Sequence, residues 1–387
     1  MKPLKVLITN HTLDKRAGTE LYVRDVATAL LRRGHAPVVY SPRLGAVAQE
    51  IRAATVPVVD DLDALAHPPD IIHGQHNLET MTALLRFPRT PAVFFCHGWR
   101  PWQEAPPRFP RILRYIAVDE TCRDRLLYEH AIPANRVHLL LNFVDLERFT
   151  PRGPLPARPQ RALVFSNSAT EASYLSIVRA ACARAGITLD VIGWRSGNSA
   201  AQPEQLLGQY DLVFAKARCA LEAMACGAAV VLCDEAGMGV LVTTTEFDRL
   251  RRQNFGIRTL QARPDAAALA REIARYDPHD AAEVSRRVRA TAGREETVNQ
   301  IIALYEEVLA EFAAHNNEQA AQADHAAQAD CAAAGEAQAA AAYLRWLSIQ
   351  VWREAEAAHN YKSIRLARFI ARAPLVRTLV AWKNSKP

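Results

Sequence analysis

A single glutamate interrupts an apolar, helix-like stretch of this sequence. Glu222 lies in the run CALEAMACGAAVV (residues 219–231), among alanine, leucine, methionine and cysteine. A buried carboxylate is costly unless it is paired or hydrogen-bonded, and its oxygens can accept hydrogen bonds from the vicinal hydroxyls of a ribose. Lys216 and Arg218 precede it at the start of the same predicted helix, where cations and free N–H groups favour a diphosphate. These side chains predict a nucleotide diphosphate site, with a solvated face as the alternative for the two cations.

The first predicted strand, KVLITN (residues 5–10), leads into a second candidate anion site. Gly18 and Thr19 precede a predicted helix. A glycine at that position lets backbone N–H groups approach an anion with the help of the helix dipole. An ordinary helix start with Thr19 as the N-cap is the alternative. The segment lacks a GxGxxG pattern, which argues against a nicotinamide-type dinucleotide site.

Histidines follow two other predicted strands. His97 ends the strand AVFFCHG (residues 92–98) and stands beside Trp99. A histidine there serves as a polar anchor or handles a proton, so His97 is a candidate catalytic residue. His73 and His76 occupy a similar place in IIHGQH, where a hydrogen-bonded core histidine is the alternative for His73.

Further polar side chains follow the predicted strands of the second half. Ser166 and Asn167 end the segment RALVFSNS, and Arg195 lies in GWRSGN after the next strand. Ligands bind at the carboxyl ends of parallel strands, so these three residues are candidate nucleotide contacts. The triplet Asp61–Asp63 (DLD) resembles a metal-binding motif, but a helix cap explains it better. No metal site is expected.

The elements that position these residues alternate between strand and helix. Short apolar strands separated by helix-length segments predict a parallel sheet buried on both faces. In the first half the strands lie in KVLITN, APVVYS, DIIHGQ, AVFFCHG, YIAVDE and VHLLLN. In the second half they lie in RALVFSNS, LDVIGW, YDLVFAK and AVVLCD. The expected fold class is α/β, with two Rossmann-like, doubly wound domains that face a cleft.

Helices are predicted between these strands and after them. One runs from Thr19 to Arg33 and ends at Gly34. The second half is expected to contain the Glu222 helix and others over the following ranges: 170–185, 203–208 and 283–314. The proline-rich segment TPRGPLPARPQ is typical of an interdomain linker. The predicted domains are therefore residues 1–150, residues 151–314, and a helical extension over residues 315–387.

Composition restricts the class of protein further. Of the 387 residues, 50% are hydrophobic and 23% are charged, as in a soluble globular protein. The seven cysteines are scattered and form no CxxC pair, which argues against disulfides and structural zinc. With no signal segment or apolar membrane span in the sequence, a cytoplasmic location is expected.

The net positive charge is concentrated in the last part of the sequence. The formal net charge is +6, and residues 343–387 carry nine Lys or Arg and two Glu. A nearly neutral body argues against a nucleic-acid partner. The extension begins with an alanine-rich, helix-favouring stretch over residues 315–342. Its basic part suits either an anionic membrane surface or a helical packing partner, and both remain open. The aromatic and basic residues that favour the membrane are Trp346, Trp352, Trp382, Arg345, Arg365, Arg368, Arg372 and Arg377.

These motifs together resemble the GT-B glycosyltransferases, in particular the family-4 group of retaining, nucleotide-sugar-dependent enzymes. The resemblance covers roughly residues 1–314. Its most specific part is ALEAMACGAAVVLCDEAG. The other matching segments are AGTELYVRDVATALLRRGH, PDIIHGQH, CHGW and LLLNFVDLERF.

The resemblance implies a hexosyltransferase-type enzyme of polysaccharide biosynthesis. It implies that Glu222 binds the ribose of a nucleotide-sugar donor, that Gly18 approaches the donor phosphates, and that His97 lies near the reacting sugar. The acceptor, a glycan or lipid-linked saccharide, would bind the first domain, with His76 and Trp99 on its side. The resemblance also implies retention of configuration. The leaving diphosphate is expected to be stabilised by cations and backbone dipoles, without a metal ion or a cofactor. A peripheral position at the inner face of the cell membrane follows if the basic extension binds the membrane rather than a helical partner.

Three departures from the family pattern leave an alternative open. Phe214 stands where the family usually has a second glutamate. The segment containing Ser166 and Asn167 replaces an arginine and a lysine that usually hold the pyrophosphate, so Lys216 and Arg218 are expected to supply that charge. Asn142 is followed by phenylalanine in place of glycine. A non-catalytic binding or scaffold protein with a degenerate donor site is therefore the second hypothesis. A sugar-nucleotide epimerase would need further carboxylates in the cleft.

Overall fold

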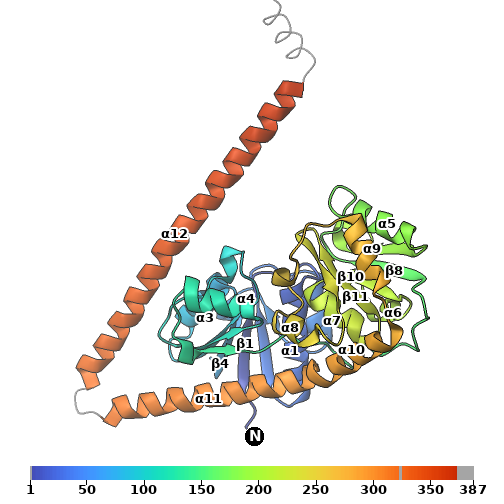
Figure 1. Ribbon diagram of the computed structural model, residues 1–387. Coiled ribbons are helices and arrows are strands. Elements are labelled where there is room, and N and C mark those ends of the chain that lie inside the picture. The colour runs from blue at the N-terminus through green and yellow to red at the C-terminus, as the bar shows by residue number, and fades with distance from the viewer. Residues whose placement is uncertain (1, 322–324, 373–387) are drawn as a thin grey trace, which may run out of the picture. The chain divides into compact units, whose positions relative to one another are not determined.

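The computed structural model describes residues 2–321 and 325–372 (Figure 1). Two compact units form: one comprises residues 2–106 and 111–318, and the other contains helix α12 (His325–Arg372). The first unit holds both predicted α/β halves, including the candidate site residues. Trp382 and Arg377 of the basic extension lie outside the described residues.

A seven-stranded parallel sheet forms the first half. Its order is β3-β2-β1-β4-β5-β6-β7, the arrangement of a doubly wound sheet. The central strands are buried along their whole length, which explains why they appear in the sequence as continuous apolar runs. The strands are β1 (Lys5–Thr9), β2 (Ala36–Tyr40), β3 (Val58–Val59), β4 (Ile71–Gln75), β5 (Ala92–Cys96), β6 (Ile112–Ala117) and β7 (Val137–Leu139).

The helices of this half cover the sheet and present their first turns at the carboxyl ends of its strands. Helix α1 begins at Gly18, one residue before the predicted start, and Gly34 lies beyond its end at a φ of +82°. The alternative of Thr19 as the N-cap is wrong: Ala17 occupies the cap position, and the Thr19 hydroxyl donates to Glu20 instead. The helices are α1 (Gly18–Arg32), α2 (Ala46–Ala53), α3 (Asn77–Arg86) and α4 (Glu120–Asp124).

A five-stranded sheet forms the second half, in the order β12-β11-β10-β8-β9. Its first four strands in sequence are parallel, and the added edge strand β12 is antiparallel to β11. The α/β class with two doubly wound sheets is confirmed. The strands are β8 (Arg161–Phe165), β9 (Thr188–Ile192), β10 (Leu212–Ala215), β11 (Ala229–Asp234) and β12 (Gly237–Leu241).

Two helices of the second half differ from their predicted bounds. Helix α5 begins at Leu175 rather than Thr170, because Thr170 and Ser173 hydrogen-bond each other in a turn. The single helix predicted over residues 283–314 is two helices, and the break at Gly293 pairs with Val144. The helices are α5 (Leu175–Arg184), α6 (Glu204–Leu207), α7 (Ala217–Ala225), α8 (Phe247–Arg252), α9 (Ala266–Ala274), α10 (Pro278–Thr291) and α11 (Arg294–Ala321).

Helix α11 returns from the second half to the first, as its path in Figure 1 shows. Its residues Val298, Ile301 and Tyr305 are buried in the core cluster that contains β1 and α1. The Tyr305 hydroxyl lies 2.5 Å from Nδ1 of His73, which is fully buried. His73 is therefore a hydrogen-bonded core histidine. The helix joins the two halves by apolar packing, which is the dominant favourable contribution to folding.

Helix α12 carries the exposed apolar side chains Leu344, Ile349, Val351 and Trp352. Among the described residues, no helix combines the length and the hydropathy needed to span a bilayer.

Candidate functional site

A cavity of about 470 Å³ lies between the two sheets of the first unit. The loop before α1 and the start of α1 form one wall, and the loops after β8 and β9 together with α7 form the other. Ligands of open α/β sheets bind at such strand ends. The polar and aromatic residues around it are Asp14, Lys15, Arg16, Arg24, Arg148, Phe149, Phe165, Asn167, Trp194, Ser199, Arg218 and Glu222.

The structure brings half of the predicted nucleotide contacts to this cavity. Gly18, Asn167, Arg218 and Glu222 line it. A Cβ on Gly18 would meet no atom within 4 Å, so the space beside its backbone is open toward a ligand. The other predicted contacts, Thr19, Ser166, Arg195 and Lys216, are not among the residues that line it.

Glu222 is buried on α7 with one oxygen engaged and one available. Its Oε1 accepts a hydrogen bond from Nε of Arg218 at 2.7 Å. No described residue donates to Oε2, and Glu222 is 4% exposed on the cavity wall. Burial raises the pKa of Glu222, and the Arg218 guanidinium opposes that rise. The pair thus explains how an apolar helix tolerates a carboxylate, and it leaves one oxygen for a hydroxyl ligand.

Arg218 has a second partner in the other half of the protein. Its Nη2 forms an ion pair with Asp25 of α1; the Asp25 side chain is 3% exposed and that of Arg218 is 14% exposed. Burial alone would raise the pKa of Asp25, but the Arg218 and Arg24 guanidiniums lower it below its ordinary value. Two carboxylates therefore share the Arg218 charge. The sequence predicted Arg218 as a phosphate cation, whereas the structure shows it positioning Glu222 and bridging α7 to α1.

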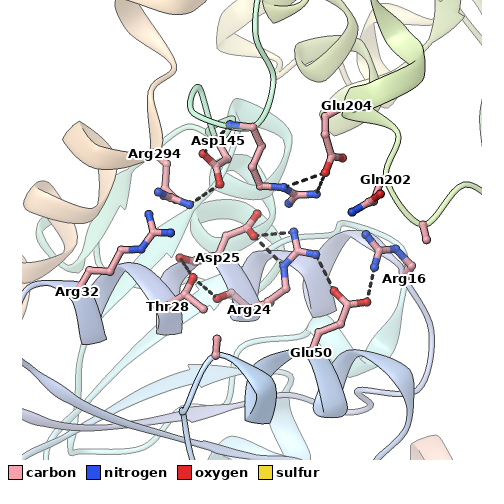
Figure 2. Close-up of a pocket in the computed structure, with 13 residues that line it drawn as sticks. Arg16, Arg24, Asp25, Thr28, Arg32, Glu50, Asp145, Gln202, Glu204 and Arg294 are labelled. Carbon is pink, nitrogen blue, oxygen red and sulfur yellow. Dashed lines mark hydrogen bonds and ion pairs between the residues drawn. The ribbon is translucent and has the colours of Figure 1, made fainter.

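This bridge continues into a charged network at a second, neighbouring cavity of about 480 Å³. Figure 2 shows Arg24, Asp25 and Glu50 pointing toward one another, with Arg16 on the far side of Glu50. Across the cavity, Arg148 pairs with Glu204 at 2.9 Å, and Arg294 pairs with Asp145. Each of these arginines has a carboxylate partner, so the second cavity is an ion-pair network that joins the halves rather than a cationic pocket.

Lys15 and Trp194 form another part of the wall of the first cavity, one from each half. The ammonium of Lys15 lies 4.5 Å from the centre of the Trp194 ring, and 59% of Trp194 is exposed. No described carboxylate lies within ion-pair distance of Lys15, so this cation is available to a ligand. The Trp194 loop is held in place because Gly193 lies against Ser166: a Cβ there would lie 1.8 Å from the Ser166 carbonyl oxygen.

Asp234, at the end of β11, interacts with two of the predicted nucleotide contacts, Ser166 and Lys216. Its carboxylate accepts from the hydroxyls of Ser166 and Ser168 at 3.1 and 2.9 Å, and its other oxygen lies 3.3 Å from Nζ of Lys216. Lys216 is thus paired within the protein. Arg195 likewise pairs with Glu235 at the surface, 3.2 Å apart.

The predicted acceptor side lies at the carboxyl ends of the first sheet. The His97 ring packs against Tyr22 at a centroid distance of 4.5 Å, and its Nε2 is inaccessible and without a partner. Burial and the nearby His76 lower the pKa of His97 to about 3, so the ring is neutral at neutral pH. Its backbone N–H donates to the buried carboxylate of Glu104, which also lies 3.4 Å from His76. Trp99 is exposed at the start of the same loop.

His11 and Glu79 also lie at the carboxyl ends of the first sheet. Neither was predicted from the sequence as a site residue. His11 follows β1, Glu79 lies on α3, and the two side chains are 2.9 Å apart. Among the described residues no cluster of three or more His, Cys, Asp or Glu can hold a metal ion. The DLD triplet is a cap, as favoured: the Asp61 carboxylate accepts from the backbone N–H of Asp63.

The comparisons with known proteins agree with this architecture. Residues 16–148 match the model of Glycosyltransferase Family 4. A glycosyltransferase from Rickettsia africae superposes with a TM-score of 0.60 at 13% identity, covering 80% of this chain and 99% of that one. The Anabaena protein HepE, solved with UDP and glucose, superposes with a TM-score of 0.58 at 15% identity, covering 79% and 100%. No curated protein sequence matches. The chain therefore has the GT-B glycosyltransferase fold, and its first half resembles family 4.

Proposed function

We propose that the protein transfers a sugar from a nucleotide-sugar donor to a hydroxyl of a glycan or lipid-linked saccharide. The observation that carries this proposal is the buried Glu222 on the cavity wall, because Arg218 orients it and leaves Oε2 for a ribose hydroxyl. The cavity lies between two doubly wound sheets, where a donor and an acceptor can meet. The complex of HepE with UDP and glucose supports a nucleotide-sugar donor for this fold.

The donor diphosphate is proposed to bind between Lys15 and the first turn of α1. Lys15 is a cavity-lining cation without a described carboxylate partner, and the open backbone at Gly18 lets helix N–H groups approach an anion. A cation and helix dipole at the leaving group stabilise the charge that develops there. We propose that they do so without a metal ion or a cofactor. We propose that the reaction retains the anomeric configuration, as the resemblance implies.

Trp194 is proposed to stack on the base of the nucleotide, because its exposed ring lies on the cavity wall. Replacing Trp194 with alanine is expected to weaken nucleoside diphosphate binding about tenfold, since base–aromatic stacking contributes roughly 1–3 kcal/mol. Isothermal titration measures the change. Trp99→Ala is the matched control: it removes an exposed tryptophan that does not line this cavity and should leave the affinity unchanged. Equal affinity in Trp194→Ala and wild type would contradict the assignment.

A non-catalytic binding protein is the second candidate, favoured by one observation. Phe214, in place of the glutamate expected from the family, is fully buried in β10. The two functions differ in turnover. A transferase releases nucleoside diphosphate from a bound nucleotide sugar, at least slowly to water, whereas a scaffold binds the donor without any release. Coupled detection of UDP, GDP, ADP or dTDP from the corresponding glucose donors distinguishes them.

The basic extension is proposed to hold the protein on an anionic membrane surface at the cytoplasmic face. Helix α12 exposes Leu344, Ile349 and Trp352, and residues 343–387 carry nine Lys or Arg against two Glu. Apolar and basic side chains together favour binding to anionic lipid surfaces. Deletion of residues 343–387 is expected to abolish cosedimentation with vesicles rich in phosphatidylserine, because the basic residues that anionic lipids attract are removed. Unchanged sedimentation would instead favour a helical packing partner.

A further inference from the structure

We propose that Asp25, which does not line the first cavity, positions Glu222 for the ribose of the donor; this inference rests on the proposed function. The two carboxylates are connected by one guanidinium. Arg218 donates from Nε to Oε1 of Glu222 at 2.7 Å and pairs through Nη2 with Oδ2 of Asp25. Arg218 and Glu222 belong to α7 and line the first cavity, whereas Asp25 belongs to α1 and lines the second.

Arg218 uses its two adjacent donors differently from several other arginines of the protein. Nε and Nη2 of a guanidinium form a planar fork that matches a single carboxylate. In Arg218 this fork is split, because Nε contacts Glu222 and Nη2 contacts Asp25. Other arginines direct both atoms to one carboxylate: Arg148 to Glu204, Arg249 to Glu246, Arg252 to Glu120 and Arg294 to Glu295.

The split fork keeps Glu222 able to accept a further hydrogen bond. No described residue donates to Oε2 of Glu222, and the charge of Arg218 is shared with Asp25. Without the charge of Asp25, both donors of the fork would turn to Glu222. A two-pronged pair of this kind makes parallel bonds that can engage both carboxylate oxygens, and it neutralises the carboxylate more completely. Both effects would weaken the contact with a ribose hydroxyl.

Asp25 is itself held from two sides. Its Oδ1 accepts hydrogen bonds from Nε and Nη2 of Arg24 at 2.9 and 2.7 Å, and its Oδ2 pairs with Arg218. Burial opposes ionisation of Asp25, but the two guanidiniums lower its pKa below the ordinary value, so the side chain is charged at neutral pH. Each oxygen thus has its own arginine, and the position of the carboxylate follows that of α1.

These contacts link the two walls of the first cavity. Helix α1 supplies the proposed diphosphate site at Gly18, and α7 supplies Glu222 for the ribose. Asp25 lies about two turns after Gly18 on the same helix. A nucleoside diphosphate has to reach both walls at once, so the Asp25 contact sets the ribose subsite relative to the diphosphate subsite. Asp25 is therefore a positioning residue that acts on the donor through Arg218.

The test measures the ribose preference by isothermal titration, as the ratio of the affinities for UDP, GDP or ADP and for the matching 2′,3′-dideoxy nucleotide. Wild type should prefer the ribose about 10- to 100-fold, and Asp25→Asn, which keeps the size of the side chain, should lose most of this preference. Arg218→Lys keeps a cation but lacks the planar fork, so it should lose the preference too, and it serves the test if Asp25→Asn does not fold. In the Glu222→Gln background, adding Asp25→Asn should not change the preference further.

Asp145→Asn is the matched control. Asp145 forms a similarly buried ion pair with Arg294 at the second cavity and contacts neither Arg218 nor Glu222. This variant should be less stable than wild type but keep the ribose preference. A wild-type preference in folded Asp25→Asn or Arg218→Lys, or an equal loss in Asp145→Asn, overturns the positioning role and leaves the proposed function standing.

The wild-type titrations separate this inference from the function on which it rests. Failure of the wild type to bind any of these nucleoside diphosphates overturns both. Binding by the wild type without a ribose preference overturns the Glu222 contact, and with it the role of Asp25.

Discussion

Replacing Asp25 with alanine is expected to lower the free energy of unfolding by about 3–5 kcal/mol, the usual effect of removing one partner from a buried ion pair. Asp25 is 2% exposed and pairs with Arg24 on its own helix and with Arg218 on α7. Its loss leaves the guanidiniums of the buried Arg24 and the partly buried Arg218 with fewer compensating charges. Urea unfolding of the full chain measures the change.

The matched control for Asp25 is an exposed ion pair of the same half. Asp63 pairs with Arg86 at 2.6 Å, and its side chain is 76% exposed. Asp63→Ala should change the stability by no more than roughly 0.5 kcal/mol, because solvent screens such pairs. Equal stabilities of the two variants would show that the Asp25 bridge does not hold the halves together.

The pH dependence gives a second readout for Asp25. Because the pKa of Asp25 is lowered in the folded state from 3.8, its contribution is present above that ordinary value and is lost as the pH falls through the lowered one. Asp25→Asn should remove this part of the acid sensitivity. An unchanged acid limb of stability in Asp25→Asn would contradict the lowered pKa.

Replacing Glu222 with glutamine is expected to weaken nucleoside diphosphate binding about 10- to 100-fold, since hydrogen bonds to charged groups contribute roughly 1.5–3 kcal/mol. The loss should depend on the ribose. Wild type should bind UDP, GDP or ADP more tightly than the matching 2′,3′-dideoxy nucleotide, and Glu222→Gln should bind both alike. Isothermal titration of the four combinations isolates the interaction between the carboxylate and the hydroxyls.

Glu235→Gln is the matched control for Glu222. Glu235 directly follows strand β11 of the second sheet. It pairs with Arg195 at the surface and does not line the cavity. Its replacement should leave both the affinity and the ribose preference unchanged. A ribose preference that survives in Glu222→Gln would place the hydroxyls elsewhere in the cavity.

Hydrophobic patterning was sufficient to predict the architecture. Each strand predicted in the two halves occurs, because buried parallel strands are continuous apolar runs that stand out between helices. The ends of the helices were harder to predict from the sequence. The start of α5 depends on the Thr170–Ser173 turn, and the break at Gly293 depends on pairing with Val144, a residue distant in sequence.

Apart from Gly18 and Asn167, which were found because they follow strands, the site was predicted where one residue conflicted with its own neighbours. Glu222 was found because a carboxylate in an apolar helix requires a partner. Asp25 lies in a helix rich in charges, where the sequence gives no sign that the other half buries it. The same holds for Lys216 and Arg218: their carboxylate partners, Asp234 and Asp25, come from other elements. His11 and Glu79 likewise come from different elements, so their contact could not be predicted from the sequence.

Binding of nucleotide sugars to the wild-type protein tests the proposed function most directly. A thermal-shift series with UDP-, GDP-, ADP- and dTDP-glucose and their nucleoside diphosphates should raise Tm for at least one pair, because a ligand at 100 times its Kd stabilises the folded state by about 2.7 kcal/mol. The same ligand should give a much smaller shift with Glu222→Gln. No shift with any of these ligands, or an equal shift in the variant, would contradict a donor site at Glu222.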